Sequence, residues 1–377
     1  MSHRSRFLAP LVIGSLLAVT GSAQPAATAP TLRGVYADDF LIGVALNTAM
    51  VTGRDARSGE IAARQFDSLT AENDMKWAEI NPQPGVYRFD AADAYVDFAQ
   101  KHSMTVIGHT LVWHSQTPRW VFEGENGQPA TREMLLQRMR DHIFAVAGRY
   151  KGRIKGWDVV NEAIADGGAD TLRDSPWRRI IGEDFIDHAF RFAREADPEA
   201  ELYYNDYNLY NRDKRARVLT MLRGMIARGV PVDGVGEQGH YQIGFPPLCD
   251  IEEAIEDFAA LGLKVMITEL DVDVLPSRGA AGVADISRRE EFEAALNPYV
   301  NGLPEAEQAR LAERYASLFG LFLKHKKHIT RVTLWGLHDG STWLNNFPVR
   351  GRVNHPLLID RDLRPKPAFF SVLEAGK

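Results

Sequence analysis

The chain has 377 residues, of which 45% are hydrophobic and 25% are charged, a composition typical of a folded globular protein. The formal net charge is -6 and no basic block interleaved with aromatic residues occurs, which argues against a nucleic-acid-binding protein. The single cysteine, Cys249, excludes an intramolecular disulfide and a metal site built from cysteines, and we expect it to be a small buried apolar residue.

The first 23 residues have the pattern of a secretory signal peptide. Basic side chains precede an apolar stretch over residues 7–19, and small residues lead up to Ala23. The apolar stretch is short for a membrane span. We therefore expect cleavage after Ala23 and export, as a secreted or periplasmic protein. A disordered Ala/Pro-rich tether should follow over residues 24–33, and residues 34–377 should form one domain.

After the tether, eight apolar runs typical of β-strands alternate with stretches of helical periodicity. The expected strands are 40–47, 65–73, 105–113, 154–162, 201–208, 234–241, 264–271 and 331–338. The expected helices are 90–102, 132–150, 183–196, 214–228, 251–261 and 306–324. Eight alternating units predict an α/β fold, a single-domain (β/α)₈ TIM barrel. An open doubly wound sheet is the alternative, but no glycine-rich phosphate turn follows the first strand.

In such a barrel the functional residues lie at the carboxyl ends of the strands. Polar and aromatic residues gather at these ends in the sequence. They are Glu72, Asn73, His109, Trp113, His114, Asn161, Glu162, Asn205 to Asn208, Gln238, His240, Glu269, Asp271 and Trp335. Glu162 and Glu269 each follow a buried strand, and two facing carboxylates can break a glycosidic bond.

The two-residue period of a strand sorts these neighbours by face. Glu269 and Asp271 share a face, whereas Asn161 and Glu162 can both reach one site only if their strand bends or ends there. His240 could donate to Glu269, and Asp271 could orient that histidine. This favours Glu269 as the nucleophile and Glu162 as the acid/base, its pKa raised by partial desolvation and by the charge of Glu269. Asn161 is then placed to bond a sugar 2-hydroxyl.

Aromatic residues and histidines at the strand ends suggest what the site binds. Trp113, Trp335 and Trp343 lie at or just past strand ends, where an indole can stack on a sugar ring. His109 and His114 are five residues apart in an extended segment, so their side chains point to opposite faces. We find no set of residues with metal-ligand spacing and expect neither a metal nor a cofactor.

Five motifs together resemble glycoside hydrolase family 10, whose members are mainly endo-β-1,4-xylanases. The resemblance extends from about residue 40 to residue 370. The motifs are Thr70-Ala71-Glu72-Asn73-Asp74-Met75-Lys76-Trp77, Gly108-His109-Thr110-Leu111-Val112-Trp113-His114, Trp157-Asp158-Val159-Val160-Asn161-Glu162-Ala163, Gln238-Gly239-His240 and Thr268-Glu269-Leu270-Asp271.

The resemblance implies that residues 34–377 are a catalytic domain that cleaves xylan with retention, with Glu162 as acid/base and Glu269 as nucleophile. It also implies three groups of sugar-binding residues. Those for the sugar two units before the cut are Glu72, Asn73, Lys76 and Gln116. Those for the sugar at the cut are His109, Trp113, Asn161, Gln238, His240, Trp335 and Trp343. Tyr207 and Asn208 would face the leaving side. The expected partners are xylan and xylo-oligosaccharides, bound by a monomer.

Two features depart from the resemblance or extend it. Tyr210 stands where many members carry a glutamate, which leaves the leaving-side contacts open. Residues 274–304 form a connection longer than is typical of a barrel, and we expect it to shape the cleft. The alternatives are a retaining barrel acting on β-glucan or mannan, a carbohydrate-binding barrel without activity, and a phosphate-binding metabolic barrel. We expect Trp343 to reject the hydroxymethyl group of glucose and so to favour xylose.

Overall fold

A closed barrel of parallel strands forms the centre of the computed structural model, which describes residues 29–168, 170–276, 284–287 and 289–377. The eight barrel strands are β1 (Leu41–Leu46), β2 (Ser68–Ala71), β3 (Thr105–Trp113), β4 (Gly156–Asn161), β5 (Glu201–Asp206), β6 (Gly234–Glu237), β8 (Lys264–Asp273) and β9 (Ile329–Leu334). Each pairs in parallel with the next, and the pairing of β9 with β1 closes the ring. A short strand, β7 (His240–Gln242), extends the pairing of β8 beyond the barrel. The predicted (β/α)₈ barrel is therefore confirmed.

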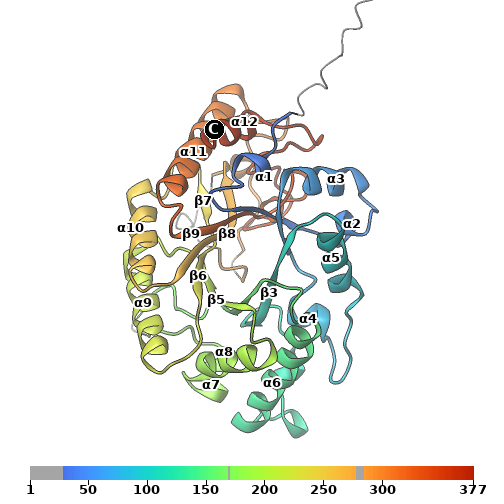
Figure 1. Ribbon diagram of the computed structural model, residues 1–377, viewed down its shortest axis with the longest axis vertical. Helices are drawn as coiled ribbons and strands as arrows, with labels where there is room; N and C mark the ends of the chain where they lie inside the picture. Colours follow the sequence, from blue (N-terminus) through green and yellow to red (C-terminus); the bar gives the residue numbers. More distant parts are fainter. Residues whose placement is uncertain (1–28, 169, 277–283, 288) are drawn as a thin grey trace, which may run out of the picture. The chain divides into compact units, whose positions relative to one another are not determined.

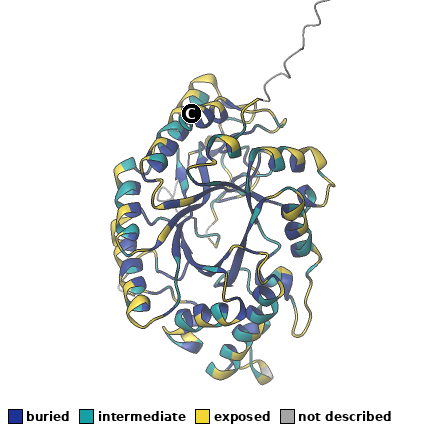
Figure 2. Ribbon diagram, in the orientation of Figure 1, coloured by how far each residue is buried: buried dark blue, intermediate teal, exposed yellow. Residues whose placement is uncertain are grey.

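Helices surround the barrel and cover its outer surface (Figure 1). They are α1 (Leu32–Val35), α2 (Thr48–Val51), α3 (Ala56–Gln65), α4 (Trp77–Ile80), α5 (Asp90–Lys101), α6 (Arg132–Arg149), α7 (Pro176–Ile181), α8 (Phe185–Ala196), α9 (Arg212–Ala227), α10 (Leu248–Ala259), α11 (Glu305–Lys324) and α12 (Pro367–Ala375). Figure 2 shows the strands buried and the helices buried on the side that faces them. The core thus lies between the barrel and the helical ring, as one-sided apolar helices require.

The six predicted helices are present with their ends shifted by a few residues. The helices α1, α2, α3, α4, α7 and α12 were not predicted, and two residues of α1 were placed in the tether. The buried face of α3 consists of Ser58, Gly59 and Ala62, so it lacks the large apolar residues by which a core-facing helix is usually recognised. Leu32 and Arg33, predicted in the tether, belong to α1. Thr31 caps this helix by accepting a hydrogen bond from the backbone N–H of Gly34, and Leu32 is fully buried. Residues 1–28, which hold the predicted signal peptide and most of the tether, lie outside the described residues.

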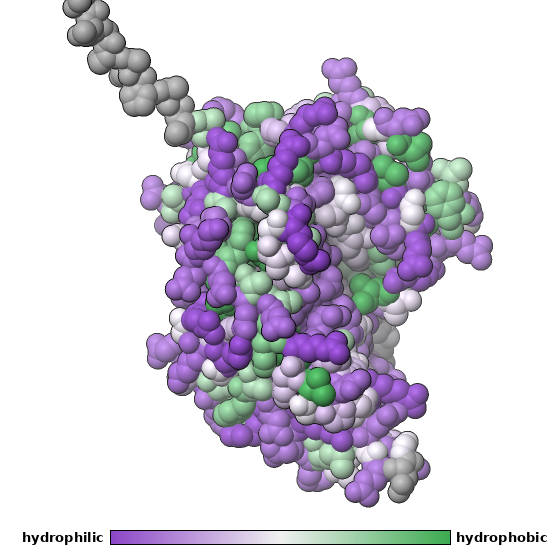
Figure 3. All heavy atoms as spheres, turned by 90° about the vertical axis from the view of Figure 1, so that its right-hand side faces the viewer, coloured by the Kyte–Doolittle hydropathy of each residue, from purple (hydrophilic) through white to green (hydrophobic). Residues whose placement is uncertain are grey.

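The prediction that Cys249 is buried is wrong. Its side chain is exposed, because Cys249 lies in the first turn of α10 and off the stripe that this helix buries. That stripe consists of Ile251, Ala254, Ile255 and Phe258. Among the described residues we find no helix with the length and apolar character needed to cross a bilayer. The face on the right of Figure 1 is largely hydrophilic, with hydrophobic residues in small separate groups (Figure 3).

A close contact between two neighbouring barrel strands fixes the position of β4 along β3, and with it the position of the last residues of β4. The indole of Trp157 on β4 packs over Gly108 on β3, which is paired with it in register. A Cβ atom at Gly108 would lie 2.1 Å from the Trp157 ring, so only glycine fits there. Four residues after Trp157, β4 ends at Asn161, next to Glu162.

Candidate active site

One pocket at the carboxyl ends of the strands brings together almost all of the predicted site residues. It has a volume of about 170 Å³. It is lined by Glu72, Asn73, Lys76, His109, Trp113, Gln116, Asn161, Glu162, Gln238, His240, Glu269, Trp335 and Trp343, and also by Ala284 and Ile286. Tyr207 and Asn208 are the predicted sugar-binding residues that do not line it.

The end of β4 lets two consecutive residues face this pocket. The strand stops at Asn161, and Glu162 adopts a left-handed backbone conformation with φ of 57°. The register of β4 against β5 also shifts between Asp158 and Val160. The alternation of side chains is therefore broken, and both Asn161 and Glu162 reach the pocket. The sequence required that the strand bend or end here if Asn161 and Glu162 were to reach one site, and β4 ends at this point.

Glu162 is a buried carboxyl group held by three donors. Its Oε2 accepts a hydrogen bond of 2.9 Å from the indole of Trp113, and its Oε1 accepts one of 2.9 Å from the Gln238 amide and one of 3.2 Å from the Asn161 amide. The pKa of Glu162 is raised to about 7, mainly by burial and next by the charge of Asp206, which has a larger effect than the charge of Glu269. The rise in the pKa of Glu162 was predicted from the sequence, but the contribution of Asp206 to it was not.

Glu269 is equally buried, but its surroundings favour the charged form. Its Oε1 accepts 2.8 Å from the Asn205 amide, and its Oε2 lies 3.2 Å from Nε2 of His240. Burial alone would raise the pKa of Glu269, but the hydrogen bond from His240 and nearby charges including that of Lys76 outweigh it, and the pKa is lowered. The two glutamates therefore differ as an acid and a nucleophile must.

His240 carries a proton because of a second carboxylate. Its Nδ1 lies 3.0 Å from Oδ1 of Asp271. Burial alone would lower the pKa of His240, but Asp271 and Glu269 together raise it to about 10. Both ring nitrogens of His240 then donate at neutral pH, one to Glu269 and one to Asp271. The predicted orienting role of Asp271 agrees with this geometry.

Asn205, for which the sequence predicted no role, connects the two glutamates by hydrogen bonds. Its Nδ2 donates to Oε1 of Glu269 and, at 2.9 Å, to Oδ1 of Asn161. The Nδ2 of Asn161 in turn donates to Glu162. The hydroxyl of Thr268 donates to Oδ1 of Asn205 at 2.6 Å, which fixes the orientation of this amide. The position of Asn205 on β5, next to β4, was the signal that could have identified it.

One end of the pocket is a polar cluster around a buried lysine. Nζ of Lys76 donates to Oδ1 of Asn73 at 3.0 Å and to Oε1 of Gln116 at 2.9 Å, and it lies 5.0 Å from the centre of the Trp113 ring. Burial lowers the pKa of Lys76 and raises that of Glu72. These residues offer donors and acceptors to a hydroxylated ligand.

Two tryptophans that line the pocket contact its polar residues. Trp343, at the start of the 3₁₀ helix η4 (Trp343–Asn345), donates its indole N–H to Oδ2 of Asp271 at 2.7 Å. Its ring stacks on Phe347 with 4.6 Å between centroids and lies 4.9 Å from the His240 ring. Trp335 meets the ring of His109 edge-on at 5.3 Å.

Tyr207 is fully buried and does not line the pocket. Its hydroxyl donates to Asp166 at 2.6 Å and accepts from Arg173 at 2.7 Å, and Nζ of Lys214 lies 3.6 Å from its ring centre. The hydroxyl of Tyr210, the residue that departs from the family pattern, donates to Oδ1 of Asn208 at 3.0 Å. The predicted contacts of Tyr207 and Asn208 with a leaving-side sugar stay predictions.

A group with metal-ligand spacing lies elsewhere in the part of the chain that the structure describes. It consists of Glu252, Glu256 and His325, at α10 and the end of α11. No spacing pattern in the sequence indicates this group, because its members are brought together by helix packing. Glu252 already pairs with His325 at 2.5 Å and with Lys324 at 2.6 Å. This group belongs to the helical ring and not to the catalytic pocket.

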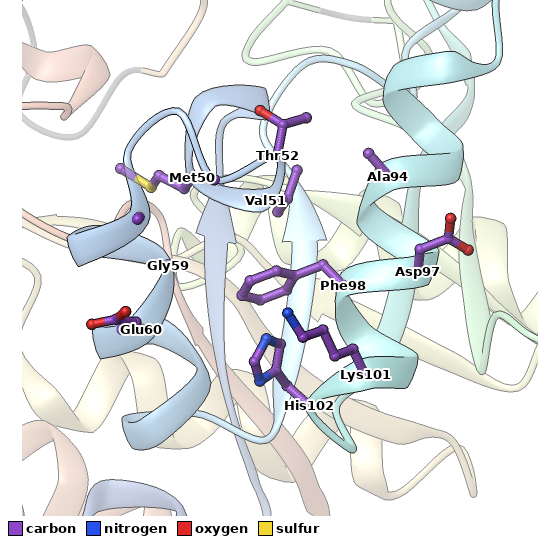
Figure 4. A pocket seen from close by; sticks show the side chains of 12 residues that line it. Met50, Val51, Thr52, Gly59, Glu60, Ala94, Asp97, Phe98, Lys101 and His102 are labelled. Atoms are coloured by element: carbon purple, nitrogen blue, oxygen red, sulfur yellow. The ribbon is translucent and has the colours of Figure 1, made fainter.

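A larger hollow, of about 520 Å³, lies between α2–α3 and α5. The phenyl ring of Phe98 lies at its centre, with Glu60 on α3 and Asp97 on α5 on opposite sides of it (Figure 4). Both carboxylates are exposed to solvent. This hollow lacks a buried carboxyl pair, although it is larger than the pocket that holds Glu162 and Glu269. The chemistry of the lining residues, and not the volume, therefore identifies the reactive site.

Comparison with known proteins gives a consistent result. The family model "Glycosyl hydrolase family 10" matches residues 31–375. A protein named endo-1,4-beta-xylanase A, from Xylanibacter ruminicola, is 46% identical over 345 residues, which cover 92% of this chain and 93% of that protein. A solved endoxylanase from a sugarcane soil metagenome is 46% identical, with a TM-score of 0.88 over 91% of this chain and 99% of that one. A solved structure in complex with xylotriose is 40% identical, with a TM-score of 0.82 over 92% and 99% of the two chains.

Proposed function

The chain belongs to glycosyl hydrolase family 10, and from this premise we propose that it cleaves internal β-1,4-xylosidic bonds of xylan with retention of configuration. One observation supports the chemistry most strongly. Two buried glutamates, Glu162 and Glu269, line one pocket, and their pKa values are shifted in opposite directions. A retaining glycosidase needs this difference, because one carboxyl must hold a proton while the other attacks.

In the first step Glu269 attacks the anomeric carbon while Glu162 gives its proton to the leaving glycosidic oxygen. The bond to the leaving sugar breaks as a covalent bond from the anomeric carbon to Glu269 forms. In the second step Glu162, now ionised, takes a proton from a water molecule while the water oxygen attacks the anomeric carbon. The covalent bond between that carbon and Glu269 breaks, and Glu269 leaves as a carboxylate. Both oxygens of Glu269 accept hydrogen bonds, from Asn205 and His240, which stabilise it as the nucleophile and later as the leaving group.

The other lining residues would hold the two sugars that precede the cut. Lys76, Asn73, Glu72 and Gln116 form the polar cluster suited to the sugar two units before the cut. Asn161 would bond the 2-hydroxyl of the sugar at the cut, because its Nδ2 carries a second hydrogen besides the one given to Glu162.

The sugar at the cut would also meet six further lining residues. These are His109, Trp113, Gln238, His240, Trp335 and Trp343. Family membership supports xylose as this sugar, and Trp343 supplies a wall where a hydroxymethyl group would project. No step in this scheme calls for a metal ion or an organic cofactor.

A parallel digestion tests the choice of substrate. Xylan, β-glucan and mannan are incubated with equal enzyme, and the products are sized over time. We expect xylan to be cut to a range of xylo-oligosaccharides from the earliest times, as internal cleavage requires. Faster release of sugars from glucan or mannan would contradict the proposal, and release of one short product from chain ends would contradict internal cleavage.

We further propose that the protein acts outside the cytoplasm as a monomer. The signal-peptide pattern over residues 1–23 supports export, since xylan is too large to enter a cell. Mass spectrometry of the protein from the culture medium and periplasm should find a mature chain that begins at Gln24. Size-exclusion chromatography with light scattering should give the mass of one chain.

A further inference from the structure

The last residue of β5, Asp206, lies beside Glu162 on the neighbouring strand. Asn161 pairs in register with Asn205, and the backbone N–H of Glu162 donates to the carbonyl of Asn205 at 2.9 Å. The residue that follows Asn205 is therefore next to Glu162. Asp206 is fully buried and does not line the catalytic pocket, so it acts on the pocket only through its neighbours.

Three donors converge on the carboxylate of Asp206. Its Oδ1 accepts a hydrogen bond of 2.9 Å from the backbone N–H of Tyr207 and lies 2.8 Å from Nζ of Lys214, on α9. Its Oδ2 accepts a hydrogen bond from the hydroxyl of Tyr204. The side chain of Lys214 is 3% exposed and that of Asp206 is 0% exposed, so water hardly screens these charges from their neighbours.

Tyr204 connects Asp206 to the backbone that follows Glu162. The hydroxyl that donates to Asp206 also accepts hydrogen bonds from the backbone N–H groups of Ala163 and Ile164, at 3.1 and 3.2 Å. Glu162 itself has the left-handed backbone conformation, with φ of 57°. A residue other than glycine keeps this conformation only where its surroundings hold it. Asp206 and Tyr204 supply part of that hold.

Lys214 divides its charge between two carboxylates. Its Nζ lies 2.8 Å from Oδ1 of Asp206 and 2.9 Å from Oδ1 of Asp166. The second cation of this cluster, Arg173, lies 3.3 Å from Oδ2 of Asp166 and 3.6 Å from Oδ2 of Asp285. Of the cations in the described part of the chain, only Lys214 forms an ion pair with Asp206. The charge of Asp206 is therefore offset mainly by one side chain.

The charge on Asp206 bears directly on the proton of Glu162. The groups that face Glu162 are Asp206, Glu269, Lys76, Arg173 and the hydroxyl of Tyr207. Those that face Asp206 are Lys214, Arg173, Glu162, Glu237 and the hydroxyls of Tyr204 and Tyr207. After burial, the charge of Asp206 is the largest cause that raises the pKa of Glu162. Loss of Asp206 and loss of Lys214 should therefore move that pKa in opposite directions.

From this geometry we propose that Asp206 is a positioning residue for the cleavage step. It holds the backbone after Glu162 through Tyr204 and opposes loss of the Glu162 proton through its charge, while Lys214 limits that charge. The proposal rests on the proposed function, because it concerns the proton that Glu162 gives to the leaving oxygen. A pair with only a structural role would lose activity when either partner is removed, with no change in pH dependence.

The test measures kcat/KM for xylohexaose between about pH 5 and about pH 10, on either side of the Glu162 titration. Asp206→Asn removes the negative charge and leaves Lys214, so the midpoint of the alkaline limb should fall by about one pH unit. Lys214→Met keeps a side chain of similar length without the cation. Its midpoint should rise by about half a pH unit, because Arg173 remains nearby.

The double variant of Asp206→Asn and Lys214→Met completes the comparison. Both charges are then absent, so neither is left buried without its partner. Its midpoint should lie above that of Asp206→Asn and below that of Lys214→Met. If Lys214→Met alone does not fold, the double variant and Asp206→Asn still measure the effect of the cation.

Two controls separate the charge from the packing. Tyr204→Phe removes the contact with the backbone but no charge, so kcat/KM should fall while the alkaline limb stays in place. Asp339→Asn breaks an equally buried ion pair, in which Nζ of Lys366 lies 2.9 Å from Asp339. Neither residue of that pair lines the pocket, so this variant should lose stability without a shift of the limb.

A titration without substrate distinguishes this proposal from the proposed function. NMR of ¹³C-labelled glutamate carboxyl groups, with Glu162 identified by the signal that Glu162→Gln lacks, should show the same opposite shifts. Midpoints that stay in place, or that move in the same direction in folded Asp206→Asn and Lys214→Met, would overturn the proposal. Failure of the wild type to cleave xylohexaose while the NMR titrations shift as expected would instead contradict the proposed function.

Discussion

The burial of Glu162 predicts where activity should fall on the alkaline side. Its pKa is raised from 4.5 to about 7, mainly by burial and next by the charge of Asp206. The protonated fraction should fall from about nine-tenths at pH 6 to about one-tenth at pH 8, because the group titrates near 7. Since the first step needs this proton, kcat/KM for xylan should fall about tenfold between these two pH values.

Replacement of Glu162 by Gln separates proton donation from the rest of the site. On xylan the variant should lose about 10²–10⁴-fold in kcat/KM, the range typical of a general acid. On an aryl xylobioside with an acidic phenol as leaving group, the first step needs no proton, so kcat/KM should be largely kept. The alkaline limb should disappear for this substrate, because the group that titrates is gone.

The same substitution has an expected effect on stability, with a definite sign. A carboxyl whose pKa is raised on folding favours the folded state fully below pH 4.5, and this contribution is lost as the pH rises to about 7. The shift corresponds to about 3 kcal/mol. The glutamine loses one acceptor, worth about 1–2 kcal/mol, since Trp113 and Gln238 donate to different oxygens. We therefore expect Glu162→Gln to unfold in urea with a free energy about 1–2 kcal/mol higher at pH 8.

Two results would refute this reasoning about Glu162. One is a wild-type kcat/KM that is the same at pH 6 and pH 8. The other is a Glu162→Gln variant that loses equal activity on xylan and on the activated aryl substrate, since the residue would then not act as the proton donor.

Three further predictions concern other residues of the barrel. Asn205→Ala removes a donor to Glu269 and should raise the pKa of that carboxylate, moving the acidic limb of kcat/KM up by about one pH unit; an unmoved limb would show that Asn205 does not stabilise the charge. Trp343→Ala should raise the ratio of aryl-cellobioside to aryl-xylobioside kcat/KM, with Trp343→Phe intermediate, and an unchanged ratio in a folded variant would remove its specificity role. Gly108→Ala should lower the free energy of unfolding by several kcal/mol, because its Cβ would lie 2.1 Å from Trp157. Gly148→Ala in α6, where a Cβ meets nothing within 4 Å, should instead raise it by about 0.5–1 kcal/mol, and similar effects at both sites would contradict the packing argument.

Much of the barrel could be predicted because its strands are continuous apolar runs that end in polar residues. The failures have local causes. The buried face of α3 consists of Ser58, Gly59 and Ala62, so it lacks the large apolar residues that mark a core-facing helix, and α1 has only four residues, too few to show a helical period. Cys249 was placed in the core from its residue type, although its position in the first turn of α10 leaves it exposed.

The site was predictable where the residues themselves carry the chemistry and not where they act through neighbours. The sequence placed Glu162 and Glu269 near the carboxyl ends of strands, and both line one pocket, although β8 continues beyond Glu269 to Asp273. The role of Asp206 in the pKa of Glu162 depends on burial and distance, which spacing along the chain does not give. The ion pair of Arg173 with Asp285 joins two connections that are far apart in sequence, and no pattern in either one indicates it.

The most direct test of the account is chemical rescue of Glu269→Ala by azide. This variant should be folded but unable to cleave an aryl β-xylobioside, since the nucleophile is missing. Added azide can enter the space of the lost carboxylate and attack the anomeric carbon from the same face. We predict restored release of the phenol and an α-xylobiosyl azide, identified by NMR. A β-linked azide, or no rescue in a folded variant, would contradict the assignment of Glu269 as the nucleophile.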